Sequence, residues 1–121
     1  MSWYHEQPAM NQTELEKSKV YIIKEITKYI SNAVVSKTIL KKTTGNISVM
    51  AFDMNEGLAE KISPFDSFAQ IIEGKAEIII DGTSFFLETP EVIIIPAHKS
   101  SSIKANERFK MILTVIKSGY E

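Results

Sequence analysis

Hydrophobic and polar residues alternate with a period of two along much of the second half of the chain. In the run at residues 47–54, every second residue falls on one face of a strand, namely Ser48, Met50, Phe52 and Met54. The run at residues 109–116 alternates in the same way, and its far end is apolar on both faces. A strand covered on both sides shows that pattern. The periodicity therefore predicts β-strands.

Turn-forming residues separate short runs of Val, Ile, Phe and Ala at regular intervals. They are Gly57, Pro64, Gly74, Gly82, Pro90 and Pro96. Asp81 and Gly82 lie between two β-rich runs, and an Asp-Gly pair favours a tight hairpin turn because glycine accepts a positive φ. This spacing predicts an all-β sandwich or barrel of many short strands.

The first third of the chain follows a different pattern. Residues 1–18 are polar and mixed in charge, and we interpret them as a tail. We expect residues 19–44 to form an arm, a short helix followed by an extended segment, that packs on the barrel or on a partner subunit. The barrel is then expected to span residues 45–121. The helix prediction depends on apolar residues at helical spacing, which are Ile22, Ile26, Tyr29 and Ile30.

The composition narrows the classes of function. A chain of 121 residues with 44% hydrophobic and 24% charged residues is expected to form one globular domain. Its 14 Lys+Arg against 15 Asp+Glu give a formal net charge of -1, which argues against a nucleic-acid partner. The absence of cysteine excludes disulfides and thiol chemistry, and the apolar runs are far shorter than the ~20 residues of a membrane helix. We expect a soluble, cytoplasmic protein without a membrane partner.

The order of motifs resembles that of the small single-domain cupins. The segments that carry the resemblance are PFD followed by QIIEG, within residues 64–74, and IIIPAHKSSSIKANERFKMILT, residues 93–114. The resemblance covers about residues 34–117. It implies an all-β double-stranded β-helix, which is a jelly-roll barrel with an open mouth. Cupins of this kind are commonly homodimers.

The resemblance also implies where a metal ion would be held. Metal-binding cupins supply two histidines and a carboxylate from the first motif and a third histidine from the second. When the motifs are aligned on Gly74 and Pro96, these positions are Lys61, Ser63, Ser67 and Ser101. Ammonium and hydroxyl groups are poor metal ligands, so we expect neither a metal nor another cofactor. Two glycines of the second motif are replaced, by Pro90 and His98.

We therefore predict that the barrel mouth binds a small polar or anionic molecule. The predicted ligand-binding residues are Lys61, Ser63, Phe65, Ser67 and Ser101. If Lys61 points inward, it would bind an anion, and otherwise its stem lies along an apolar wall. The three hydroxyls would hydrogen-bond a polar ligand, or they only fill space left by a lost metal site. If Ser67 faces the lumen, alternation directs Gln70 outward.

Two other functions remain open, and the catalytic residues of any reaction are unknown. Some cupin relatives are metal-independent isomerases or epimerases that use a histidine base and a tyrosine acid. We expect His5 and His98 at the surface, so this alternative depends on Tyr29 reaching the mouth from the arm. The other alternative is a sensor or interaction module that signals through dimer contacts.

Two adjacent phenylalanines favour a homodimer. Phe85 and Phe86 cannot both lie on one face of a strand. One of them should therefore meet a second layer, which is either the arm or another subunit.

Overall fold

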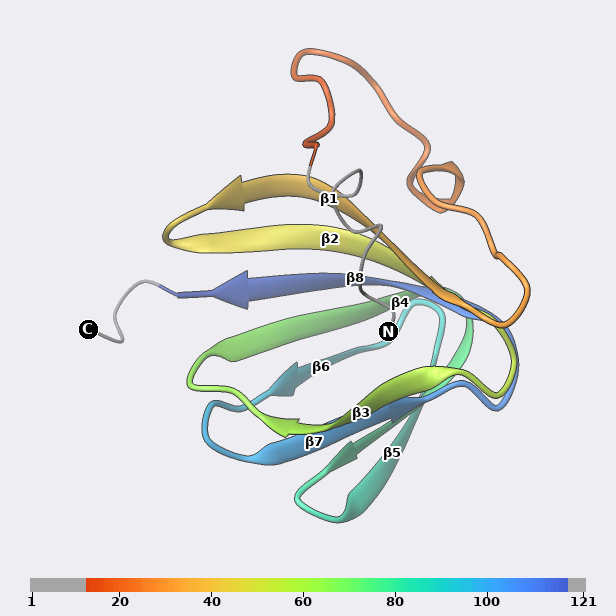
Figure 1. The fold of residues 1–121 in the computed structure, drawn as a ribbon, viewed down its shortest axis with the longest axis vertical. Helices are drawn as coiled ribbons and strands as arrows, with labels where there is room; N and C mark the ends of the chain where they lie inside the picture. Colours follow the sequence, from red (N-terminus) through yellow and green to blue (C-terminus); the bar gives the residue numbers. More distant parts are fainter. Residues whose placement is uncertain (1–12, 118–121) are drawn as a thin grey trace.

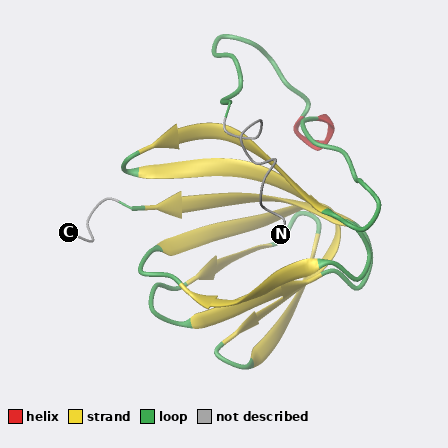
Figure 2. Ribbon diagram, viewed as in Figure 1, coloured by secondary structure: helices red, strands yellow, loops and turns green. Residues whose placement is uncertain are grey.

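The computed structural model describes residues 13–117, in which two antiparallel layers curl around one core (Figure 1). Strand is the dominant secondary structure (Figure 2). The strands are β1 (Val34–Lys42), β2 (Gly45–Phe52), β3 (Gly57–Ile62), β4 (Asp66–Ile80), β5 (Thr83–Glu88), β6 (Val92–Ile95), β7 (Ser100–Lys104) and β8 (Phe109–Ile116). The first layer contains β1, β2, β8, β6 and the first half of β4, and the second contains β3, β7, β5 and the second half of β4. The predicted all-β jelly roll is confirmed.

Strand β4 passes from one layer to the other at Gly74. Its first half pairs with β8 and β6, and its second half pairs with β5 and β7. Gly74 has a φ of +78°, and a Cβ added there would lie 2.3 Å from the carbonyl oxygen of Arg108. Any other residue would clash with that carbonyl, so the crossing requires glycine.

The β4–β5 hairpin confirms the turn predicted from the Asp-Gly pair. Asp81 and Gly82 have φ values of +52° and +84°, and Ile80 lies directly opposite Thr83. Positive φ at both central residues is the geometry of a tight two-residue hairpin turn.

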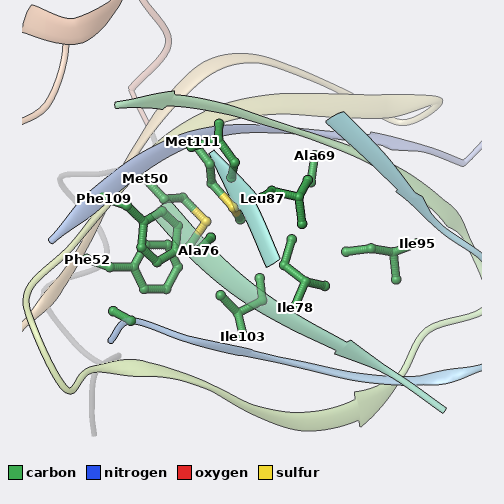
Figure 3. Packing of buried hydrophobic residues seen from close by; sticks show 12 residues of the cluster. Met50, Phe52, Ala69, Ala76, Ile78, Leu87, Ile95, Ile103, Phe109 and Met111 are labelled. Atoms are coloured by element: carbon green, nitrogen blue, oxygen red, sulfur yellow. The ribbon is translucent and has the colours of Figure 1, made fainter. Parts of the chain in front are cut away.

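The hydrophobic core lies between the two layers (Figure 3). The rings of Phe52 and Phe109, which lie opposite each other on β2 and β8, stack with centroids 4.4 Å apart. Neither ring is exposed. Met50 and Met111 form the next pair on the same face of these strands, and both are buried. The alternation predicted for residues 109–116 is confirmed at this end.

The short helix of the arm is present only as one 3₁₀ turn, η2 (Ile23–Glu25). Its neighbours are rich in β-branched residues, which lose side-chain freedom in a helix. The carbonyl oxygen of Lys24 also accepts a hydrogen bond of 2.6 Å from the Nζ of Lys110, a buried residue of β8, and this bond ties the turn to that strand. Among residues 13–117, no helix has the length and apolar character needed to cross a membrane.

The rest of the arm also lies against the first layer. Its extended segment is β1, which hydrogen-bonds to β2 from Val34 to Lys42. Before it, the Tyr29 hydroxyl donates a hydrogen bond of 2.6 Å to a carboxylate oxygen of Glu73 on β4. Most of the predicted tail, residues 1–12, lies outside the described residues.

Candidate functional site

A cavity of about 280 Å³ lies at the end of the barrel where β3, β6 and β8 end. We call it the mouth cavity. These three strand ends are at the left in Figure 1. All five residues predicted from the sequence line it: Lys61, Ser63, Phe65, Ser67 and Ser101. The structure thus brings these residues together, and their role in binding a ligand stays a prediction.

The first layer contributes Ser67 through its register. Ser67 lies directly opposite Ile95 on β6 and Val115 on β8, and both neighbours also line the cavity. The next two β4 residues on that face are fully buried in the core. Gln70 lies on the other face, opposite Val92 and Ile112, as alternation from an inward Ser67 predicts.

The second layer contributes Lys61 through a β-bulge. Leu58 lies opposite the core residue Ile103, and Lys61 lies opposite Ser101, so β3 has one residue more than β7 between these pairs. In a regular strand, Leu58 would share its face with Glu60 instead. The extra residue turns Lys61 toward the cavity, and Glu60 does not line it.

Ser63 organises the turn that presents Phe65. Its Oγ accepts a hydrogen bond of 3.1 Å from the backbone N–H of Phe65. Its carbonyl oxygen accepts one of 2.7 Å from the N–H of His98, which joins two loops at the rim. The Ser63 hydroxyl can still donate its own proton to a ligand.

His98 occupies a backbone position that suits the glycine of the family motif. It has a φ of +68°, in the left-handed region that glycine enters without a steric penalty. Its side chain is exposed, as predicted.

Two further lysines line the mouth cavity, and the sequence analysis missed both. Lys99 lies in the loop between β6 and β7, and its Nζ is 3.9 Å from an oxygen of the exposed Asp81. Lys117 follows β8, and its Nζ lies 5.7 Å from the ring centroid of Phe65. Both belong to strand ends, whose position relative to a cavity depends on the register of several strands.

The lining of the mouth cavity is positive. Lys61, Lys99 and Lys117 line it, and no Asp or Glu among residues 13–117 does. The whole chain has a formal net charge of -1, so the positive charge is local to this end of the barrel.

Comparison with known protein families identifies the family of this chain. The family described as ethanolamine utilisation protein EutQ matches residues 13–117, which is most of the sequence. The chain belongs to the EutQ family. Among curated protein sequences, none matches it.

Solved structures show that this EutQ-family chain has the fold of a small cupin. A conserved protein of unknown function from Streptococcus pyogenes is 27% identical with a TM-score of 0.82, over 87% of this chain and 92% of that one. A cupin superfamily protein from Desulfitobacterium hafniense is 24% identical with a TM-score of 0.76, over 85% and 94%. A putative ethanolamine utilization protein Q from Salmonella typhimurium is 13% identical with a TM-score of 0.63, over 71% of each chain. The last two likenesses concern the fold.

The residues of the mouth cavity do not fit the metal ion that cupins commonly hold. The four positions that correspond to metal ligands carry one ammonium and three hydroxyl groups, which bind transition metals poorly. Nowhere in residues 13–117 do three His, Asp or Glu side chains gather closely enough to hold an ion.

Tyr29 does not line the mouth cavity of this EutQ-family cupin. Its ring lies against Lys110 and Arg108, with the Lys110 Nζ 4.9 Å from the centroid. Lys110 alternates with the core residues of β8, so this contact is on the outer face of the first layer. Burial and the hydrogen bond to the Glu73 carboxylate raise the pKa of the Tyr29 hydroxyl. Tyr4 and Tyr120 lie outside the described residues.

Proposed function

We propose that this EutQ-family cupin binds a small polar or anionic molecule in the mouth cavity without the help of a metal ion. The observation that supports this function is that Lys61, Ser63, Phe65, Ser67 and Ser101 all line one cavity. The lining combines apolar walls with a few polar groups, which is typical of small-molecule sites. A volume of about 280 Å³ suits a ligand smaller than a drug-sized molecule.

We propose binding rather than isomerisation because of the groups at the cavity. Its lining within the described chain contains neither a histidine nor a tyrosine. An acid–base mechanism needs a titratable side chain within hydrogen-bond reach of the ligand. Within the described residues, the titratable groups of the lining are Lys61, Lys99 and Lys117, which supply neither the histidine base nor the tyrosine acid of the isomerase alternative.

Ethanolamine itself is not the ligand that we propose, although the family description names its utilisation. An amine of this kind carries a positive charge at neutral pH. Three lysines would repel it, since like charges close together disfavour binding. Any part in ethanolamine utilisation would involve a different molecule.

A thermal-shift screen of untagged protein against sugars and sugar acids tests the proposed function. A compound present at about a hundred times its Kd should add ~2.7 kcal/mol to the free energy of unfolding. The Ser67→Leu variant should lose this stabilisation because the larger side chain fills the cavity. Gln70→Leu is the matched control, since Gln70 lies on the outer face of the same strand. Stabilisation that survives Ser67→Leu would place the ligand elsewhere and contradict the proposal.

Metal analysis of the same preparation tests the metal-free part of the proposal. We expect less than one transition-metal ion per ten chains. A stoichiometric ion that resists dialysis would contradict it.

We further propose that the chain is a homodimer. Phe85 and Phe86 are 41% and 71% exposed, so the described part of the arm does not cover them. Light scattering should report a dimer at micromolar concentration, and Phe86→Ser should shift it toward the monomer. A monomeric parent protein would contradict the proposal.

A further inference from the structure

We infer that the ligand of the mouth cavity is a small organic molecule with two negative charges, held by lysines from three separate segments of the chain. The inference rests on the proposed function and names the class of ligand. Lys61 comes from β3, Lys99 from the β6–β7 loop, and Lys117 from the segment after β8.

The charge of the lining selects an anion. A concave surface lined by groups of one sign attracts and concentrates ligands of the opposite sign. The mouth cavity has three lysines, and no carboxylate of the described chain lines it. Hydrogen bonds between an ammonium and a carboxylate or phosphate are also stronger than those between neutral groups.

The balance of the three lysines indicates two negative charges on the ligand. Lys99 approaches Asp81 at 3.9 Å, which offsets part of its charge. Within residues 13–117, no carboxylate forms an ion pair with Lys61 or Lys117. Lys117 lies over the Phe65 ring, and this contact does not neutralise it. A ligand with two charges would balance these two ammonium groups.

The bulge in β3 decides which charge this strand contributes to the cavity. A regular β3 would turn Glu60 rather than Lys61 to the face that Leu58 occupies, and the lining would then contain a carboxylate. The observed register instead pairs Lys61 with Ser101, and both residues line the cavity.

The uncharged groups that line the cavity indicate the character of the rest of the ligand. Apolar side chains of both layers line it, among them Leu58, Ile103 and Leu113. The Ser67 and Ser101 hydroxyls and the Asn46 amide add neutral hydrogen-bonding groups. A short carbon chain with a phosphate or with two carboxylates matches this combination.

Calorimetric titration of the full chain with charged and neutral partners tests the inference. Succinate is paired with 1,4-butanediol, and glycerol 3-phosphate with glycerol, so that the two anion chemistries are distinguished. We expect at least one anion to bind at least about tenfold more tightly than its neutral partner. Its affinity should fall several-fold between about 50 and about 500 mM NaCl, because salt screens charges.

Substitutions that remove one lysine charge test whether the anion binds in the mouth cavity. Lys61→Gln should weaken binding of the anion about tenfold or more, and Lys61→Arg should retain most of it. Lys37→Gln, on β1 and outside the cavity, removes the same charge and should change the affinity less than about twofold.

The outcomes separate this inference from the proposed function. Neutral partners that bind as tightly as the anions, with Lys61→Gln unchanged, would overturn the inference and leave the proposed function intact. Anions that bind equally well to Lys61→Gln and Ser67→Leu would also overturn it, since they would bind elsewhere. If neither these probes nor the polar compounds of the thermal screen bind, both proposals are wrong.

Discussion

The two ends of the barrel use the same strands but are filled differently. Toward the mouth, the inward residues of β8 are Phe109, Met111, Leu113 and Val115. Those of β2 are Phe52, Met50, Ser48 and Asn46. Along both strands the side chains become smaller or more polar. The stacked rings of Phe52 and Phe109 close one end, which we call the filled end, and the other end holds a cavity of about 280 Å³.

Because of this difference, we expect substitutions at the two ends to affect different properties, stability at the filled end and ligand binding at the mouth. Close-packed side chains at the filled end supply much of the free energy of folding, because removing them leaves a void that the surroundings cannot close. Residues at the mouth already border a cavity, so changing them costs less. A binding site can therefore be altered at the mouth without unfolding the barrel.

The largest expected effect is at the filled end. Phe109→Ala should lower the free energy of unfolding by about 3–5 kcal/mol, because the ring is fully buried and stacked on Phe52. The same substitution at Phe65, which lines the mouth, should cost about 1–2 kcal/mol. Urea denaturation of both variants measures this. Equal losses of unfolding free energy in the two variants would contradict the difference between the two ends.

The contact between the arm and the first layer comes next. Tyr29→Phe removes the hydrogen bond to Glu73 and should lower the free energy of unfolding by about 1–2 kcal/mol. Because this contact lies on the outer face, ligand binding at the mouth should not change. A loss of ligand affinity in this variant, with the fold intact by circular dichroism, would show that the arm influences the cavity.

A smaller effect of opposite sign is expected at the rim of the mouth. His98→Gly should raise the free energy of unfolding by up to about 1 kcal/mol, since glycine adopts the φ of +68° without strain. The hydrogen bond from the residue 98 N–H to Ser63 is kept. His98→Ala is the control and should show no gain, because alanine pays the same backbone cost. A lower midpoint of thermal unfolding for His98→Gly would show that the imidazole itself stabilises the rim.

The smallest effect concerns acid sensitivity next to the filled end. The Arg108 side chain and the Asn32 N–H hold the pKa of Asp53 at about 2, below its ordinary value of 3.8. This contribution to stability is therefore present above about pH 4 and is lost as the pH falls toward 2. Asp53→Asn should lower stability at pH 6 and flatten the loss between pH 4 and 2. Urea midpoints at several pH values measure the slope, and an unchanged slope would show that other groups cause the acid sensitivity.

Much of the candidate site could be predicted from the sequence. The alternation along β2 and β8, the Asp81–Gly82 turn and the motif glycine at Gly74 are local features, so each is readable without knowledge of distant residues. Alignment to the family motif then named four residues, Lys61, Ser63, Ser67 and Ser101, which line one cavity together with Phe65. The helix of the arm was overestimated, because apolar spacing does not reveal that Lys110 holds the Lys24 carbonyl.

The amino-acid order by itself determined the strand periodicity, the hairpin turn and the absence of metal-ligand side chains at the family positions. Only the tertiary structure decided which charge enters the cavity. The bulge in β3 directs Lys61 rather than Glu60 to the cavity, and distant strand ends bring Lys99 and Lys117 to the same cavity. The physical reason is that side chains alternate with a period of two, so a shift of one residue exchanges the two faces of a strand. That shift is set by pairing with β7, which lies about forty residues further along the chain.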